Sequence, residues 1–173
     1  MANRPTLLNS CAYAATAAEA RYRIDAKPQQ ARASCVVALD AGATGVVAVL
    51  RDEPWLGARF LTYDAHRPRQ RDGGDHALTD VVLGTGDGGQ VRLSEQLDDT
   101  DFMMMIATAN DGAAAATAIG NACTLRGIMT AGVILGDAAS TGAAVSALRP
   151  HARVLLVTND RGDVADLMSA VGA

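Results

Sequence analysis

Polar residues that can bind an anion occur in three segments of the second half of the chain: Thr108–Gly112, Gly136–Gly142 and Thr158–Asp163. Each segment combines hydroxyl, amide or carboxylate side chains with a glycine, and each comes just before a stretch that is typical of a helix. A helix N-terminus offers unpaired backbone N–H groups and a partial positive charge, so these segments are suited to an anionic ligand.

Two of these segments contain the residues with the clearest expected roles. Ser140, Thr141 and Gly142 would receive the anion, and Arg161 would pair with its carboxylate or phosphate group. The whole set expected to contact the ligand is Thr108, Asn110, Asp111, Gly112, Asp137, Ser140, Thr141, Gly142, Asn159, Asp160 and Arg161. Because Asn, Asp, Ser and Thr are also the preferred helix caps, the same pattern fits a purely structural role.

Carboxylates in these segments complicate the binding of a bare phosphate, because they would repel it. Mg²⁺ would bridge the charges, since it is commonly coordinated by carboxylate and phosphate oxygens together. For a nucleotide or phosphate ligand we therefore expect Asp111, Asp137 and Asp160 to hold Mg²⁺. A hydroxylated or cationic ligand is the alternative.

Two further segments carry residues of chemical interest. The polar stretch 64–76 contains arginines, aspartates, His66 and His76. It fits a lid over an acidic ligand, a docking site for an acidic partner, or a solvated loop with internal charge pairs. If the protein is an enzyme, the two histidines are the acid–base candidates. The stretch Gly84–Gly89 follows an apolar run and fits either a phosphate-binding loop or a flexible turn. Because it lacks the lysine of a P-loop and the helix of a dinucleotide motif, the turn is favoured.

The elements that position the three polar segments alternate regularly between strand and helix. Apolar runs at 101–108, 128–135 and 153–158 predict buried parallel strands, and the stretches 113–127, 140–148 and 163–171 predict helices. Short connections of this kind produce right-handed crossovers on a parallel sheet. We therefore expect a three-layer, Rossmann-like or flavodoxin-like α/β domain with a mostly parallel sheet, whose carboxyl edge brings the polar segments together.

The first half of the chain is less regular. Residues 59–63 and 80–83 predict short strands. The stretch 31–51 contains two apolar runs separated by DAGATG, so it fits either a β-hairpin or a single buried helix. The high content of β-branched residues favours the hairpin.

The chain's 173 residues fit one domain, which we expect at 29–173, preceded by an arm at 1–28 that contains a helix. No apolar run is long enough to span a membrane, and the net charge of −4 argues against nucleic-acid binding. Three widely separated cysteines suit a reducing cytoplasm. Aromatic residues make up only 3% of the chain, so we expect burial against another copy or a different subunit.

The sequence thus predicts a small cytoplasmic α/β domain that binds a small anionic molecule, with a nucleotide or phosphate plus Mg²⁺ as one form of that ligand. The alternative is a non-catalytic accessory or assembly subunit that works through protein–protein contacts. In that case the polar segments are helix caps, and the helical layer or the arm forms the partner surface.

Overall fold

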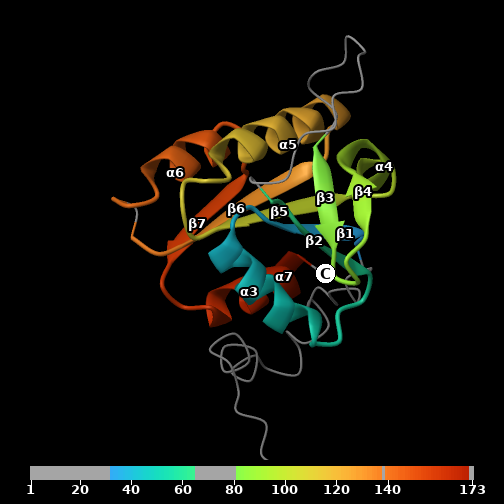
Figure 1. Cartoon of the computed structure of the whole chain (residues 1–173), viewed down its shortest axis with the longest axis horizontal. Coiled ribbons are helices and arrows are strands. Elements are labelled where there is room, and N and C mark those ends of the chain that lie inside the picture. Colours follow the sequence, from blue (N-terminus) through green and yellow to red (C-terminus); the bar gives the residue numbers. More distant parts are fainter. Residues whose placement is uncertain (1–31, 65–80, 138, 172–173) are drawn as a thin grey trace, which may run out of the picture.

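A seven-stranded sheet forms the centre of the computed structural model, which describes residues 32–64, 81–137 and 139–171. From one edge to the other the strand order is β4-β3-β2-β1-β5-β6-β7 (Figure 1). The strands are β1 (Ser34–Ala38), β2 (Ala58–Thr62), β3 (Val82–Thr85), β4 (Gln90–Arg92), β5 (Phe102–Ala107), β6 (Met129–Leu135) and β7 (Val154–Thr158).

The sheet is parallel except at one edge. β1 pairs in parallel with β2 on one side and with β5 on the other, and β6 and β7 continue the parallel part. β3 and β4 are added as antiparallel strands beside β2. Numbered along the chain, the parallel strands therefore lie in the order 2-1-3-4-5, the flavodoxin-like order, with its switch point between β1 and β5. The predicted fold class is confirmed.

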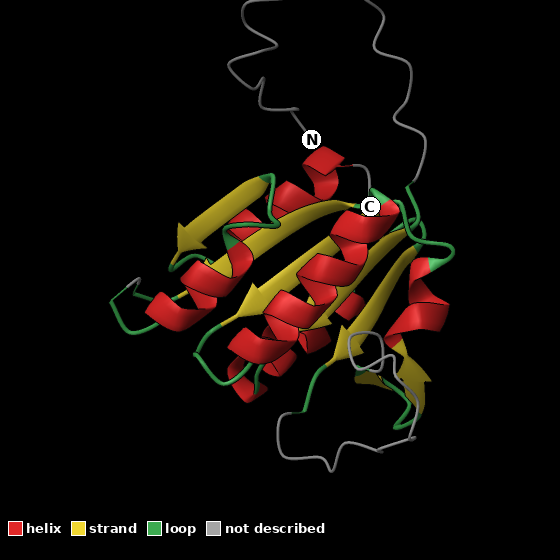
Figure 2. Ribbon diagram, turned by 90° about the horizontal axis from the view of Figure 1, so that it is seen from above, coloured by secondary structure: helices red, strands yellow, loops and turns green. Residues whose placement is uncertain are grey.

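Helices cover both faces of the sheet (Figures 1 and 2). α3 (Ala41–Arg51) and α7 (Gly162–Val171) lie on one face, while α4 (Leu93–Leu97), α5 (Ala113–Arg126) and α6 (Gly142–Leu148) lie on the other. Alternate residues of β5 belong to opposite layers: Met104 packs with the α3 and α7 side chains, and Met103 and Met105 pack with those of α5. Because both faces are covered, β5 is apolar along its whole length, and β1 and β6 are apolar except for Ser34 and Thr130.

The expected hairpin at 31–51 is wrong in its second half. Ser34–Ala38 does form a strand, but residues 41–51 form α3. The buried residues of this helix are Ala43, Val46, Val47 and Leu50, which follow the i, i+3, i+4, i+7 spacing of one helical face. Asp40 caps the helix by accepting a hydrogen bond from the Ala43 N–H. This cap and the helical spacing of the apolar residues together outweigh the β-propensity of the valines.

The expected turn at Gly84–Gly89 is confirmed as the connection of the β3–β4 hairpin. Gly88 has a φ of +88°, a conformation that favours glycine. A Cβ atom at Gly86 would overlap the guanidinium of Arg51, at the end of α3. The hairpin turn therefore lies near the C-terminal end of α3, away from the carboxyl edge of the parallel strands.

Several expectations fall on residues outside the described ranges. They are the helical arm at 1–28, the two histidines His66 and His76, and nearly all of the stretch 64–76. None of the helices in the described ranges combines the length and the apolar character needed to cross a membrane.

A pair of glycines in α3 provides a matched test of the helix packing. A Cβ atom at Gly42 would lie 2.1 Å from the Thr108 Oγ1 atom, whereas one at Gly45 would meet nothing within 4 Å. We expect Gly42→Ala to lower the free energy of unfolding by about 2 kcal/mol through overpacking. Gly45→Ala should raise it by up to about 1 kcal/mol through helix propensity. Urea denaturation of both variants checks this, and equal effects would contradict the packing.

The buried thiols provide a test of the core. Burial raises the pKa of the Cys35 thiol to about 12 and that of Cys123 to about 11, from an ordinary value of 9.0. In a Cys11→Ser variant, neither thiol should react with Ellman's reagent at mildly alkaline pH until the protein unfolds. The unfolded chain loses these protons first, so the free energy of unfolding should fall as the pH rises from 9 towards 12. Rapid labelling of the native variant would contradict the burial.

Candidate functional site

All three polar segments lie at the carboxyl edge of the parallel strands, because they follow β5, β6 and β7 directly. The connection between β1 and α3 reaches the same edge. The expected meeting of the segments at one edge is therefore confirmed, while their contact with a ligand remains a prediction.

Asp40 joins the first of these connections to the β5–α5 connection. Its side chain is only 5% exposed and accepts four hydrogen bonds. Oδ1 accepts from the Ala43 N–H (2.9 Å) and the Thr108 hydroxyl (2.6 Å). Oδ2 accepts from the backbone N–H groups of Thr108 (2.7 Å) and Ala109 (3.0 Å). One carboxylate thus caps α3 and holds the end of β5 against it.

Two glycines let the same connections approach each other closely. A Cβ atom at Gly42 would collide with the Thr108 hydroxyl, and one at Gly112 would lie 2.2 Å from the Leu39 carbonyl oxygen. The backbone on the two sides of the switch point is therefore in contact. In an open α/β sheet a ligand binds in the crevice at this point. Here protein atoms occupy its centre.

Asn110 caps a helix other than the one it precedes. Its Oδ1 atom accepts hydrogen bonds of 3.0 Å from the N–H groups of both Ala143 and Ala144, in the first turn of α6. Its Nδ2 atom donates to the Ser140 carbonyl oxygen (2.8 Å). The N-cap residue of α5 is Gly112, which has no side chain, so no side-chain hydrogen bond caps this helix at its start. The Asn110 side chain therefore links the β5–α5 connection to α6.

The polar groups after β6 and β7 are largely engaged in internal hydrogen bonds. The hydroxyls of Ser140 and Thr141 both donate to the Asp137 carbonyl oxygen at 2.9 Å. The Asp160 Oδ1 atom accepts from the Gly162 N–H at 2.8 Å, at the start of α7. These contacts are typical of capping and turns. They leave fewer free N–H groups for an anion than the sequence pattern suggests.

The three expected metal ligands are Asp111, Asp137 and Asp160. Within the described part of the chain, no three His, Cys, Asp or Glu side chains are grouped closely enough to hold a metal ion. The three carboxylates therefore do not form a ligand cluster by themselves. Mg²⁺ held by one or two carboxylates together with phosphate oxygens remains a prediction.

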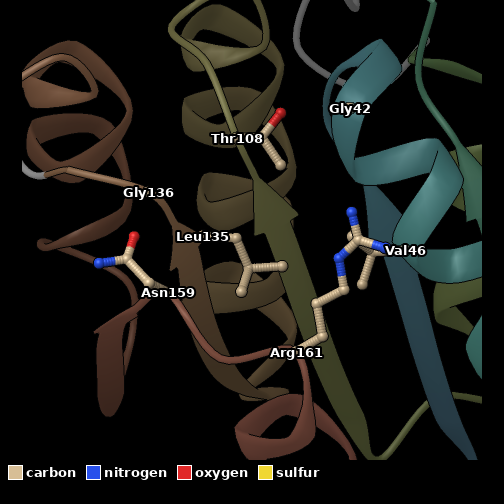
Figure 3. Close-up of a pocket in the computed structure, with 7 residues that line it drawn as sticks. All are labelled: Gly42, Val46, Thr108, Leu135, Gly136, Asn159 and Arg161. Carbon is tan, nitrogen blue, oxygen red and sulfur yellow. The ribbon is translucent and has the colours of Figure 1, made fainter.

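A pocket of about 340 Å³ opens at the carboxyl edge, on the α3 and α7 side of the sheet (Figure 3). Val46 and Leu135, which are almost fully buried, supply its apolar surface. Its polar side chains are Thr108, Asn159 and Arg161. The described residues that line it are Gly42, Val46, Thr108, Leu135, Gly136, Asn159 and Arg161.

Arg161 gives this pocket its charge. Its side chain extends from the β7–α7 connection towards α3 and ends beside Val46 (Figure 3). It is the one charged side chain among the described lining residues. Within the described ranges its guanidinium forms no hydrogen bond or ion pair. The pocket therefore presents an unneutralised positive charge above an apolar surface.

The sequence prediction and the pocket overlap at Thr108, Asn159 and Arg161. Other predicted residues do not line the pocket: Asn110, Asp111, Gly112, Asp137, Ser140, Thr141, Gly142 and Asp160. Sequence reasoning missed Asp40, and with it Gly42, Val46 and Leu135. The signal for Asp40 is its position directly after an apolar run and before residues with helical apolar spacing.

Comparison with known proteins gives no family for this chain. No protein-family model matches it, and no curated protein matches it significantly.

Asp40 provides a test of this edge. Asp40→Ala removes a helix cap and leaves one hydroxyl and three backbone N–H groups without their acceptor. We expect the free energy of unfolding to fall by about 3 kcal/mol. Asp111→Ala is the matched control, because Asp111 is exposed on a neighbouring connection, and its effect should stay within about 0.5 kcal/mol. Denaturant titration measures both, and a small loss for Asp40→Ala would contradict the bridge.

Proposed function

We propose that the protein binds a small organic anion in the pocket beside α3 and α7. The anionic group pairs with Arg161, and an apolar part of the ligand lies on Val46 and Leu135. The observation that carries this proposal is the exposed guanidinium of Arg161, which has no partner among the described residues and lies over the pocket. An arginine in this position forms bidentate hydrogen bonds with carboxylate or phosphate oxygens.

The distribution of charge supports an anion rather than a cation. No carboxylate is among the described lining residues. The acids nearest in sequence each accept a hydrogen bond from the protein: Asp40 bridges two connections, Asp160 accepts from the Gly162 N–H, and Asp163 accepts from the Thr158 hydroxyl. These hydrogen bonds offset part of the repulsion that aspartates at this edge would exert on an anion.

The apolar surface of the pocket supports an organic ligand rather than an inorganic ion. Val46 is 3% exposed and Leu135 is 9% exposed, so both belong to the core and form a fixed surface. A volume of about 340 Å³ is at the lower end of the usual range for small-molecule sites. Apolar contact and one ion pair together favour a ligand with an apolar body and a single anionic end.

Mg²⁺ and the cytoplasmic location are further parts of the proposal. Asp160 lies between the pocket residues Asn159 and Arg161 in sequence, so it is the carboxylate best placed to share Mg²⁺ with a phosphate ligand. The cytoplasmic location is supported by Cys35 and Cys123, which are buried free thiols.

Phenyl phosphate and benzoate test the pocket, with inorganic phosphate and benzyl alcohol as probes for the two halves of the ligand. We expect phenyl phosphate and benzoate to raise the Tm by a few degrees at saturating concentration, and each half alone to have a smaller effect. Arg161→Gln should weaken the binding of both anions by about tenfold or more. Arg149→Gln, at an exposed position after α6, is the matched control and should leave binding unchanged.

Equal binding by wild type and Arg161→Gln would refute the assignment of the anion to Arg161. Equal stabilisation by inorganic phosphate and phenyl phosphate would remove the apolar part of the ligand from the proposal. Adding Mg²⁺ should strengthen the binding of phenyl phosphate but not of benzoate. If Mg²⁺ changes neither, the metal is removed from the proposal and the anion site at Arg161 is unaffected.

A further inference from the structure

β7 is an edge strand with the composition of a central strand. Its sequence is Val-Leu-Leu-Val-Thr, and its outer side has no neighbouring strand among the described residues. Val154 is 46% exposed and Val157 is 41% exposed. Apolar runs of this kind are typical of parallel strands that are covered on both faces. β7 therefore presents apolar side chains where the sheet ends.

The exposed valines lie on opposite faces of the sheet. Side chains alternate along a strand, so Val154 shares a face with Leu156, and Val157 shares the other with Leu155. Leu156 packs on the cluster formed with α3 and α7, and Leu155 packs on the cluster formed with α5 and α6. Both helical layers thus reach the strand but leave part of each face open. An added strand would cover apolar surface on both faces at once.

This edge lacks the features that usually prevent strands from pairing. Natural edge strands are protected by charged side chains, proline, bulges or short length. β7 contains neither a charge nor a proline over its five residues. The opposite edge of the sheet ends in β4, which has only three residues, one of them Arg92. The two edges therefore differ in their capacity to accept a further strand.

We propose that β7 pairs with β7 of a second copy of this chain, in antiparallel orientation about a two-fold axis, so that the two sheets become one. A two-fold axis perpendicular to the sheet places the same face of both sheets on the same side. Residues that lie opposite each other in the two strands then share a face, so their positions differ by an even number. Centred on Leu156, this register places Leu155 opposite Val157 of the partner subunit. It places Val154 opposite Thr158 of the partner subunit. The exposed valines are then covered by the copy's own strand.

The charges that flank β7 favour a second copy in this orientation. Arg153 precedes the strand and Asp160 follows it, and both are exposed. Within the described ranges the Arg153 guanidinium has no hydrogen-bond or ion-pair partner. From the described residues, the Asp160 carboxylate accepts a single hydrogen bond, which the Gly162 N–H donates. Antiparallel pairing brings the basic start of each strand beside the acidic end of the other, so opposite charges meet twice.

The first experiment measures the oligomeric state of the full chain by sedimentation velocity over a range of micromolar concentrations. We expect a dimer for the wild type and a monomer for Val157→Lys, because a lysine on the edge blocks strand pairing. Val157 is exposed in the single chain, so the substitution leaves the fold intact, which circular dichroism checks. Val49→Lys is the matched control: Val49 is 59% exposed on α3, and this variant should remain a dimer.

A charge-reversal series tests the orientation. We expect Arg153→Asp and Asp160→Arg each to weaken the dimer by about tenfold, because each places like charges together at both ends of the paired strands. The double variant exchanges the two charges and should recover most of the lost affinity. An additive loss in the double variant would reject the antiparallel register.

Three results would overturn the proposal. One is a monomeric wild type at every concentration, and another is a Val157→Lys variant that dimerises like Val49→Lys. The third comes from hydrogen exchange at the β7 amides that point away from β6. If they exchange slowly in a monomer, independently of concentration, another part of the same chain covers the strand. Exchange that slows as the dimer forms supports the proposal.

Discussion

The arrangement of the carboxyl edge depends on the buried carboxylate of Asp40. This one group accepts hydrogen bonds from the first turn of α3 and from the end of β5, the two strand-to-helix connections on either side of the switch point. The carboxyl group can occupy this nearly buried position because four donors replace the water it loses. Thr108 is fixed as a result, and with it the close approach that only a glycine at position 42 permits. The opening of the pocket is therefore determined by a residue that does not line it.

Although the backbone is closed at the switch point, a pocket lined by described residues opens in one layer of the domain. The pocket lies beside α3 and α7, where Val46 and Leu135 form its apolar surface and Arg161 its charge. Asn110 meanwhile holds α6 from the opposite layer through its two hydrogen bonds to the helix start. Polar groups at this edge thus have two separate tasks. Most connect the loops to the helices, and a few, led by Arg161, remain free to meet a ligand.

The sequence predicted the parallel half of the fold well, because long apolar runs and short glycine-containing connections leave few alternatives after Asp101. It failed at 41–51, where Val46, Val47 and Val49 suggested a strand although the buried residues repeat with helical spacing. At 41–51 tertiary packing and the Asp40 cap favoured the helix over the strand that the valines prefer locally. The site was harder to predict, because residues such as Asn110 form hydrogen bonds with a helix 33 residues further along the chain. Side chains that cap helices and side chains that bind ligands are of the same types, so only the completed hydrogen bonds distinguish them.

The antiparallel hairpin at the far edge of the sheet has a consequence for the size of any assembly. Its last strand, β4, has three residues, and its polar ends Gln90 and Arg92 are exposed. If two chains join through β7, a hairpin of this kind lies at each outer end of the combined sheet. No further copy can then add by the same contact, because the surface that drives pairing is used up at the centre. The fold thus favours a closed pair over an open-ended fibre, even though its apolar edge strand is of the kind that in other proteins leads to aggregation.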